Sequence, residues 1–344
     1  MNIRLQFLAY CACFALLLTA CNRADLPDPL DALTERNAPA FLALNYTTAP
    51  INNIDGAIDY RFAADIPYSL QHQRNVLDIF TLAKAEPTPL VVFIHSGGFV
   101  RGDKKEAYGF ERDIEQFLAA GIAFASINYR FLEQTNNGVL GSLEDSKRAI
   151  QFLRYHAKSF NIDPKRIACF GVSAGAGASL WLATHDDMAV LNSRNPIDRM
   201  STRIQSAVAL GTQASYDLLQ WEEIFRAFNF SLTENEENVE ALSSFYPVED
   251  VSELYQAEMI DYRERVDMLQ LMSEEDAAIY AFNPGSAQPP ANEGELYHHP
   301  FHVLALQERA EAVGLEHQAY APGLGLMSIE GETPVAFTIR KLLE

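Results

Sequence analysis

The 344-residue sequence has few cysteines, a deficit of basic residues and no long hydrophobic run. Three of its four cysteines lie within the first 21 residues, which leaves Cys169 without a partner in the body of the chain, so we expect no structural disulfide. Lys and Arg number 26 against 46 Asp and Glu, and a surface with this formal charge of −20 repels nucleic acid. Since 48% of the residues are hydrophobic, a disordered or fibrous protein is excluded too.

Residues 1–20 have the pattern of a secretory signal peptide. Arg4 is their only charged residue, and residues 5–18 are mostly apolar. This apolar run is too short to span a bilayer comfortably, which favours a cleaved signal over a permanent anchor.

The segment Leu18-Thr19-Ala20-Cys21 resembles the bacterial lipobox, in which the cysteine becomes the lipidated first residue after cleavage. A plain signal peptide that ends near a cysteine is the alternative. The resemblance implies that acyl chains on Cys21 anchor the protein in the cell envelope, and Asn22 favours the outer membrane over the inner one. Residues 21–50 are polar and contain several prolines, so we interpret them as a tether.

Strand and helix patterns alternate over residues 51–344, which predicts an α/β domain with a mostly parallel sheet and helices on both faces. The predicted strands are 58–62, 76–82, 90–95, 123–129, 166–171, 205–210, 278–282 and 316–320. The predicted helices are 112–120, 143–160, 174–184 and 301–313. Residues 76–80 alternate between apolar and polar side chains, which is typical of an antiparallel edge strand.

Residues 213–276 interrupt this alternation. They contain no strong strand pattern, while aromatic and acidic residues recur at helical spacing. We interpret them as a helical cap inserted above the carboxyl edge of the sheet; an ordinary peripheral helical layer is the alternative.

The segment Gly171-Val172-Ser173-Ala174-Gly175 follows an apolar strand and begins a helix of small residues. A G-x-S-x-G sequence in this context predicts a nucleophile elbow, in which flanking glycines allow a sharp turn that exposes the serine. The amide of Ala174, at the helix start, would then face a developing oxyanion. A tight turn with no catalytic role is the alternative.

A second glycine-containing segment, His95-Ser96-Gly97-Gly98-Phe99, directly follows the apolar strand residues 90–94. Because Gly97 and Gly98 have no Cβ atoms, their amides can approach the carbonyl oxygen of a substrate. His95 lies on this oxyanion side, and we interpret it as a residue that braces the loop rather than as a base.

Together with residues 77–80 and 127–130, these two segments resemble carboxylesterases of the α/β-hydrolase superfamily, in the hormone-sensitive-lipase-like and feruloyl- or acetyl-esterase-like branch. The resemblance implies an α/β-hydrolase fold with an eight-stranded sheet. It also implies that Ser173 is the nucleophile and that the amides of Gly97, Gly98 and Ala174 form the oxyanion hole. Ser96 stands where the family usually has glycine.

The sequence departs from this family at its C-terminal end. The loop after the last predicted strand has Leu326 where the family has its catalytic histidine, and no histidine follows His317. After the seventh predicted strand comes Asn283-Pro284-Gly285-Ser286, which contains no aspartate. Without an adjacent imidazole, Ser173 would remain a poor nucleophile.

Histidines between the seventh strand and its helix offer a replacement base. His298 and His299 precede the helix and His302 lies in its first turn; we rank the first two higher because loop side chains are freer to turn towards the elbow. The candidate acids that would orient the histidine are Glu293, Glu295 and Asp217. Helix-start histidines without a catalytic role are the alternative. The spacing of these histidines is not that of a zinc site, so we predict no metal and no cofactor.

The sequence therefore predicts a serine carboxylesterase that hydrolyses esters of small or carbohydrate-linked acids, with a small-molecule ester as substrate. The alternative is a catalytically inactive envelope lipoprotein of the same fold, which binds a ligand or a protein partner. The elbow and glycine loop favour the enzyme, and the missing histidine and aspartate favour the binding protein.

Overall fold

The computed structural model describes residues 41–52, 54–232, 242–327 and 331–344. The predicted signal peptide, the lipidation site at Cys21 and most of the predicted tether lie outside these residues. Among the helices of the described ranges, none combines the length and the apolar character that crossing a membrane requires.

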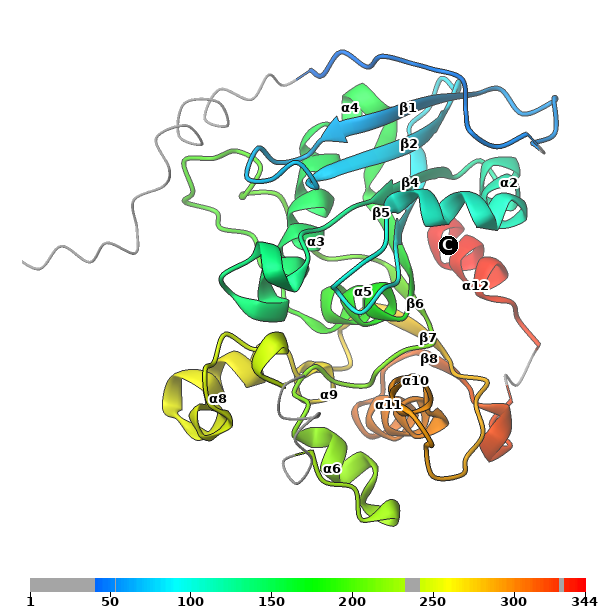
Figure 1. Ribbon diagram of the computed structural model, residues 1–344. Coiled ribbons are helices and arrows are strands. Elements are labelled where there is room, and N and C mark those ends of the chain that lie inside the picture. The colour runs from blue at the N-terminus through cyan, green and yellow to red at the C-terminus, as the bar shows by residue number, and fades with distance from the viewer. Residues whose placement is uncertain (1–40, 53, 233–241, 328–330) are drawn as a thin grey trace, which may run out of the picture.

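An eight-stranded sheet forms the centre of the molecule, in the order β1-β2-β4-β3-β5-β6-β7-β8 (Figure 1). The strands are β1 (Tyr60–Pro67), β2 (Val76–Leu82), β3 (Thr88–Ile94), β4 (Ala123–Ile127), β5 (Ile162–Val172), β6 (Ser206–Leu210), β7 (Ala278–Phe282) and β8 (His317–Tyr320). Neighbours from β4 to β8 are parallel, whereas β2 is antiparallel to both β1 and β4. The predicted α/β-hydrolase fold with a mostly parallel sheet is confirmed.

The prediction for β2 is only half right, because this antiparallel strand is not at the edge: β1 pairs with its outer side. The polar residue in its alternating pattern, Asp78, is buried rather than exposed to solvent. Its carboxylate lies 3.0 Å from the ammonium of Lys104 and accepts a hydrogen bond from the Tyr108 hydroxyl. An ion partner allows a carboxylate to be buried, and the sequence pattern alone does not distinguish such a residue from one that faces solvent.

Helices cover both faces of the sheet (Figure 1). Those of the main domain are α2 (Glu111–Ala119), α3 (Gly138–Tyr155), α4 (Ala157–Phe160), α5 (Ala174–Thr184), α10 (Glu293–Tyr297), α11 (Pro300–Val313) and α12 (Pro334–Leu343). Buried residues of α2 and α12 belong to one apolar cluster, and those of α3, α5 and α11 belong to another. Two cores on opposite faces explain why the central strands are apolar along their whole length.

The segment between β6 and β7 forms the predicted helical insertion, in the lower part of Figure 1. Its described helices are α6 (Gln220–Ile224), α8 (Ala257–Glu264) and α9 (Met268–Leu271). Tyrosine hydroxyls fasten it to the main domain: Tyr216 donates to the carbonyl of Ala174 at the start of α5, and Tyr262 donates to the carbonyl of Asn137 before α3. The cap is therefore anchored directly beside the predicted elbow.

The last part of the predicted tether packs against the domain. The amide of Leu42 donates to Ser159 Oγ, and Thr47 forms an isolated antiparallel bridge with Phe62 of β1. These contacts bring residues 42–47 of the predicted tether against the folded body.

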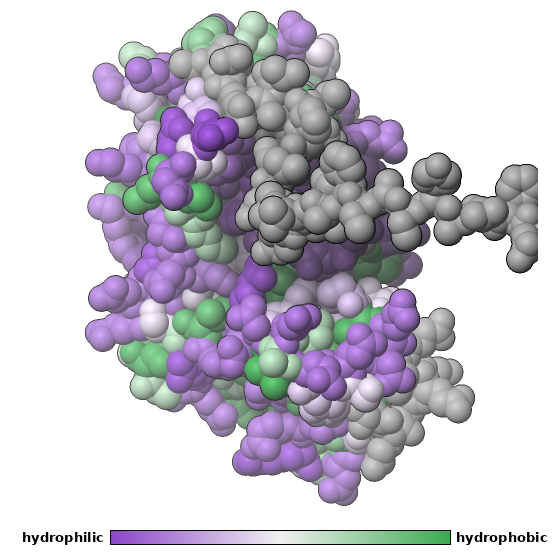
Figure 2. Space-filling model, turned by 90° about the vertical axis from the view of Figure 1, so that its left-hand side faces the viewer, coloured by the Kyte–Doolittle hydropathy of each residue, from purple (hydrophilic) through white to green (hydrophobic). Residues whose placement is uncertain are grey.

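The face in Figure 2 is mostly hydrophilic, and its apolar residues lie in small separate patches. This distribution agrees with the excess of acidic residues in the sequence.

Candidate active site

Ser173 lies on a sharp turn between the end of β5 and the start of α5. Its backbone has φ 54° and ψ −116°, a conformation that non-glycine residues adopt only when their surroundings enforce it. A Cβ atom on Gly171 would lie 2.0 Å from the carbonyl oxygen of Gly175, and one on Gly175 would lie 2.0 Å from that of Ile94. The two flanking glycines are thus required by close backbone packing, as a nucleophile elbow demands.

The strand order places the elbow between the ends of β3 and β6. Ile94 at the end of β3 pairs with Gly171, and Val172 pairs with Leu210 at the end of β6. The amide of Ser173 donates to the carbonyl of Leu210 over 2.8 Å. The loop after β3 and the residues after β6 therefore flank Ser173 on its two sides.

The glycine loop, residues 95–102, follows β3 and begins beside the elbow. A Cβ atom on Gly175 of the elbow would meet the carbonyl oxygens of Ile94 and His95. Gly97, Gly98 and Phe99 all have positive φ angles, of 111°, 63° and 61°. Within the described residues, no protein group accepts a hydrogen bond from the amide of Gly97 or Gly98. The amide of Ala174 begins a helix, where backbone donors have no partner in the preceding turn.

His95 braces this loop. Its ring stacks on Tyr129 with centroids 4.2 Å apart, and Nδ1 lies 2.6 Å from the carbonyl oxygen of Ser96. The guanidinium of Arg74 approaches the other ring nitrogen, Nε2, at 3.3 Å. Burial, reinforced by the charge of Arg74, lowers the pKa of His95 to about 4, so the ring is neutral at pH 7. Its position fits the bracing role expected from the sequence.

Ser96, the departure from the family's glycine, is also held in place. Its amide and its Oγ donate to the same carboxylate oxygen of Glu106, over 3.2 and 2.9 Å. The Ser96 amide is therefore occupied, whereas the amides of Gly97 and Gly98 remain open to a ligand.

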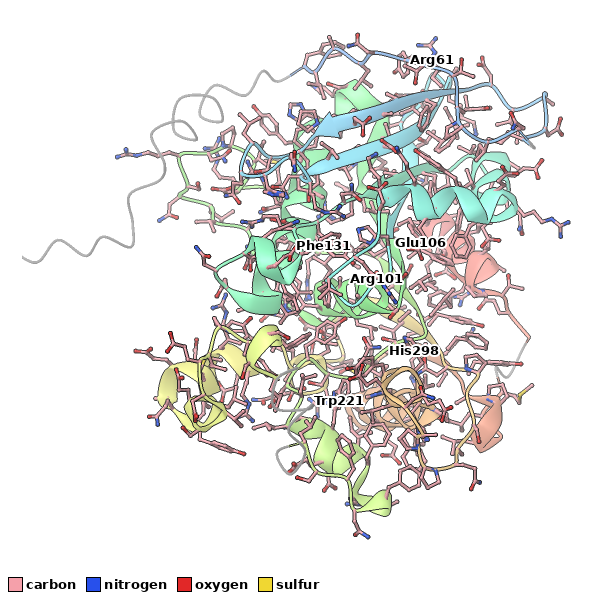
Figure 3. All side chains as sticks on the ribbon, viewed as in Figure 1. Arg61, Arg101, Glu106, Phe131, Trp221 and His298 are labelled. Atoms are coloured by element: carbon pink, nitrogen blue, oxygen red, sulfur yellow. The ribbon has the colours of Figure 1, made fainter. Side chains whose placement is uncertain are left out.

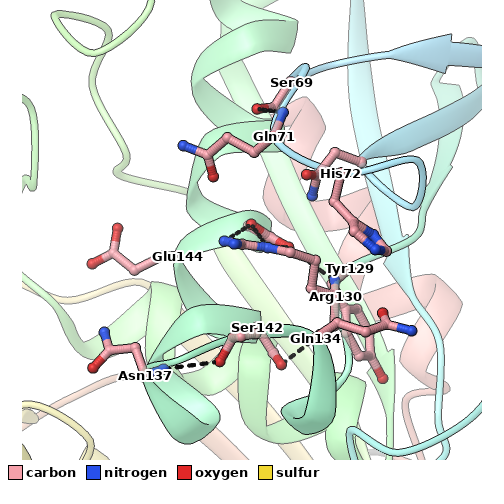
Figure 4. Close-up of polar contacts among 12 residues, drawn as sticks. Ser69, Gln71, His72, Tyr129, Arg130, Gln134, Asn137, Ser142 and Glu144 are labelled. Atoms are coloured by element: carbon pink, nitrogen blue, oxygen red, sulfur yellow. Dashed lines mark hydrogen bonds and ion pairs between the residues drawn. The ribbon is translucent and has the colours of Figure 1, made fainter. Parts of the chain in front are cut away.

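The residues after β4 connect the glycine loop to α3 through hydrogen bonds. Arg130 forms a bidentate pair with Asp145 of α3, and Ser142 Oγ donates to the Arg130 carbonyl over 2.6 Å (Figure 4). The amide of Leu132 then donates to the carbonyl of Phe99 over 2.9 Å. This chain of contacts ties the glycine loop to α3.

The structure brings one of the predicted histidines to Ser173. His298 Nε2 lies 2.9 Å from Ser173 Oγ, within hydrogen-bonding distance. In the view of Figure 3, His298 lies between Arg101 of the glycine loop and Trp221 of the cap. Its ring lies over Gly211, where a Cβ atom would be 3.5 Å from His298 Cδ2.

The Gly294 carbonyl accepts a hydrogen bond from the His298 amide over 3.2 Å, which holds the histidine beside α10. Because Nε2 faces Ser173 Oγ, the neutral tautomer that can accept the serine proton carries its own proton on Nδ1. Burial lowers the pKa of His298, and the Gly294 carbonyl offsets part of this effect. His298 is accordingly neutral at pH 7 and can accept a proton.

The structure does not bring His299 or His302 to Ser173. His299 caps helix α11: its Nδ1 accepts from the amide of Phe301, and its Nε2 lies 3.0 Å from the carbonyl of Gln288. The buried His302 accepts from the amide of Ala214. Both rings are held by groups that stabilise the helix start and the cap, which corrects the expectation that His299 is an alternative base.

The candidate acids are engaged elsewhere. Asp217 forms a bidentate pair with Arg263, over 2.8 and 2.9 Å. Glu295 accepts from the amide of Ala291 and the side chain of Asn292. Burial and the charge of Glu293 raise the pKa of Tyr297. Within the described residues, none of these three carboxylates hydrogen-bonds the ring of His298.

Within the described residues, no group of three or more His, Cys, Asp or Glu side chains is arranged to hold a metal ion.

A cavity lies away from Ser173. It has a volume of about 670 Å³ and lies between residues 41–46 and the neighbouring ends of β1, β2 and α4. Neither Ser173 nor His298 lines this cavity.

The BD-FAE family model matches residues 77–282, which is more than half of the chain. This chain belongs to the BD-FAE family, an α/β-hydrolase esterase family. The match includes the glycine loop and the elbow and ends before His298. The segments that lack the expected histidine and aspartate, around Leu326 and residues 283–286, lie outside the match, whereas Ser96 lies within it.

Curated relatives and solved structures agree with this assignment. Gut esterase 1 of Caenorhabditis elegans is 24% identical over 43% of this chain and 32% of its own length. A probable isoprenylcysteine alpha-carbonyl methylesterase of Oryza sativa subsp. japonica is 27% identical over 56% of this chain and 46% of its own. The chain thus spans less than half the length of both relatives. The crystal structure of Esterase B from Lactobacillus rhamnosis has the same fold, with a TM-score of 0.55, 14% identity and coverage of 84% of this chain and 88% of that one.

Proposed function

We propose that this protein is a serine carboxylesterase with Ser173 as nucleophile and His298 as general base. The observation that carries the proposal is the distance of 2.9 Å between Ser173 Oγ and His298 Nε2, on an elbow whose backbone exposes the serine. A nucleophile hydrogen-bonded to a base that a third group orients is the arrangement that activates an alcohol at neutral pH. The substrates we propose are esters of small acids, including those linked to carbohydrates.

In the first half of the reaction, His298 Nε2 accepts the proton of Ser173 as Oγ attacks the ester carbonyl. The oxyanion that forms accepts hydrogen bonds from the amides of Gly97, Gly98 and Ala174. The tetrahedral intermediate collapses, the C–O bond to the alcohol breaks, and His298 returns the proton to the leaving alcohol. Water then attacks the acyl-enzyme with His298 again as base, which releases the acid and restores Ser173.

The carbonyl of Gly294 opposes the lowering of the His298 pKa, but its dipole stabilises an imidazolium less than a carboxylate would. In serine proteases, replacing the carboxylate of the triad by an amide lowers kcat about 10⁴-fold, largely through the wrong tautomer. We therefore expect turnover mainly of aryl esters, whose leaving groups need little protonation.

A fluorophosphonate probe tests the nucleophile, followed by mapping of the labelled residue. Wild-type protein should be labelled at Ser173 and should hydrolyse a short-chain aryl ester, and Ser173→Ala should do neither. Ser179→Ala is the matched control, since Ser179 lies in the same helix with its Oγ bonded to the carbonyl of Gly175. Wild-type protein that shows neither labelling nor turnover would establish the inactive binding protein instead.

We further propose that acyl chains on Cys21 anchor the protein in a bacterial cell envelope, at the outer membrane. The lipobox-like segment and the following Asn22 support this location. Cys21→Ser should release the protein from the membrane fraction, and a variant that stays with membranes would show that the anchor lies elsewhere.

A further inference from the structure

Asn283 directly follows β7 and is completely buried. All of its amide hydrogen-bonding groups are engaged: Oδ1 accepts from the amide of Thr212 over 2.7 Å, and Nδ2 donates to the carbonyls of Thr212 and His299, each over 2.9 Å. One side chain thus joins the end of β7, the residues after β6 and the turn that carries the histidines.

These bonds close a ring of contacts around the candidate catalytic pair. The carbonyl of Leu210 holds the amide of Ser173, and Gly211 lies against the ring of His298. Thr212, the next residue, is clamped by Asn283, which also holds the peptide group of His299 beside His298. Residues 210–212 therefore act as a common support for both members of the pair.

We propose that Asn283 is a positioning residue that sets the distance between His298 Nε2 and Ser173 Oγ through the backbone on both sides of the pair. This inference rests on the proposed function, because positioning matters only if the pair is catalytic. Asn283 does not contact either reacting side chain; it acts on the turn that aims His298.

The hydrogen bonds at position 283 require an amide side chain, because they need both an acceptor and two donors. An aspartate at this position would have the same shape, but as a carboxylate it has no donors. It would face the carbonyl oxygens of Thr212 and His299, and burying a charge against two unsatisfied carbonyls is unfavourable. Introducing the acid that esterase sequences usually have after this strand should therefore lower activity rather than restore a triad.

The test compares Asn283→Asp and Asn283→Ala with wild type on an aryl ester, at a temperature where circular dichroism shows each protein to be folded. Gln151→Glu is the matched control, because the buried Gln151 amide also donates to two backbone carbonyls, those of Asp198 and Met200, but belongs to α3. We expect kcat per folded molecule to fall about 10²-fold in both Asn283 variants, with KM little changed, as for a small misplacement of a catalytic group. The control should lose stability and keep its kcat.

The pH profile separates positioning from simple loss of fold. A loosened turn exposes His298 to water, so its pKa rises and the acid limb of kcat/KM moves to higher pH in the Asn283 variants but not in Gln151→Glu. An Asn283→Asp variant with wild-type kcat and pH profile would overturn the inference while leaving the esterase proposal intact. Failure of both variants to fold would also overturn it, since the residue would then act through global stability alone. Absence of turnover and of Ser173 labelling in wild type would instead overturn the proposed function.

Discussion

Ser173 Oγ and His298 Nε2 lie 2.9 Å apart although 125 residues separate them in the chain. The serine comes from the turn after β5, and the histidine comes from the turn between α10 and α11, after β7. Both turns lie at the carboxyl ends of parallel strands, on either side of β6. The histidine therefore reaches the nucleophile from a different loop than the one that carries it in the esterases this sequence resembles.

His298→Ala should lower kcat on an aryl ester about 10²–10⁴-fold, the usual contribution of a general base. Added imidazole should restore part of the activity, because the cavity left by the ring adjoins Ser173. Steady-state kinetics with and without imidazole make the measurement. His299→Ala is the control, since it should weaken the start of α11 and leave kcat near wild type; equal losses in both variants would contradict the assignment of the base.

The acid limb of the pH–rate profile should lie below the ordinary histidine pKa of about 6.5. Burial lowers the pKa of His298, so the neutral base persists as the pH falls and activity is lost only when the pH passes below that lowered value. Measuring kcat/KM from pH 4 to pH 9 gives the midpoint. A midpoint above about 6.5 would indicate a carboxylate beside the ring and contradict the lowering of the His298 pKa by burial.

Gly211→Val should lower kcat about 10²-fold, the cost of a misplaced base, because a Cβ atom here already lies 3.5 Å from the His298 ring and valine adds two methyl groups beyond it. The substitution also strains the backbone, since Gly211 has φ 64°. Gly325→Val is the matched control: its φ is 73° and no neighbour lies within 4 Å of its Cβ position. The two variants should lose similar stability in thermal unfolding, and only the first should lose kcat; a similar kcat loss in both would mean that Gly211 does not constrain the ring.

Glu106→Gln should lower kcat/KM about tenfold, because hydrogen bonds to a charged partner contribute about 1.5–3 kcal/mol and here they hold the glycine loop. The carboxylate accepts from both Ser96 Oγ and the Ser96 amide. Glu133→Gln is the comparison, as Glu133 is an exposed carboxylate shortly after β4. Measuring kcat/KM of the two variants at equal folded fraction tests whether Glu106 maintains the conformation of the glycine loop. An unchanged kcat/KM for Glu106→Gln would show that the loop keeps its conformation without the carboxylate.

Much of the site could be predicted from the sequence because its signals are local. The elbow needs small residues on both sides of Ser173, and the glycine loop needs residues without Cβ atoms where the backbone turns with positive φ, so both appear as short glycine motifs. For the general base, the sequence could only limit the candidates to the neighbouring histidines His298, His299 and His302. His298 and His299 have nearly identical sequence contexts, and the direction in which each ring points depends on contacts with Ser173 and Gln288, which lie elsewhere in the chain.

The sequence by itself determined the parallel sheet, the helical insertion and the nucleophile turn, because apolar periodicity and glycine spacing follow from backbone geometry within a few residues. Only the tertiary structure decided which histidine reaches Ser173 and that the acidic candidates are paired elsewhere. It also decided that Asn283 clamps the loops on either side. These features depend on contacts between residues far apart in the chain, whose distances are set by the packing of β6 between its two neighbours.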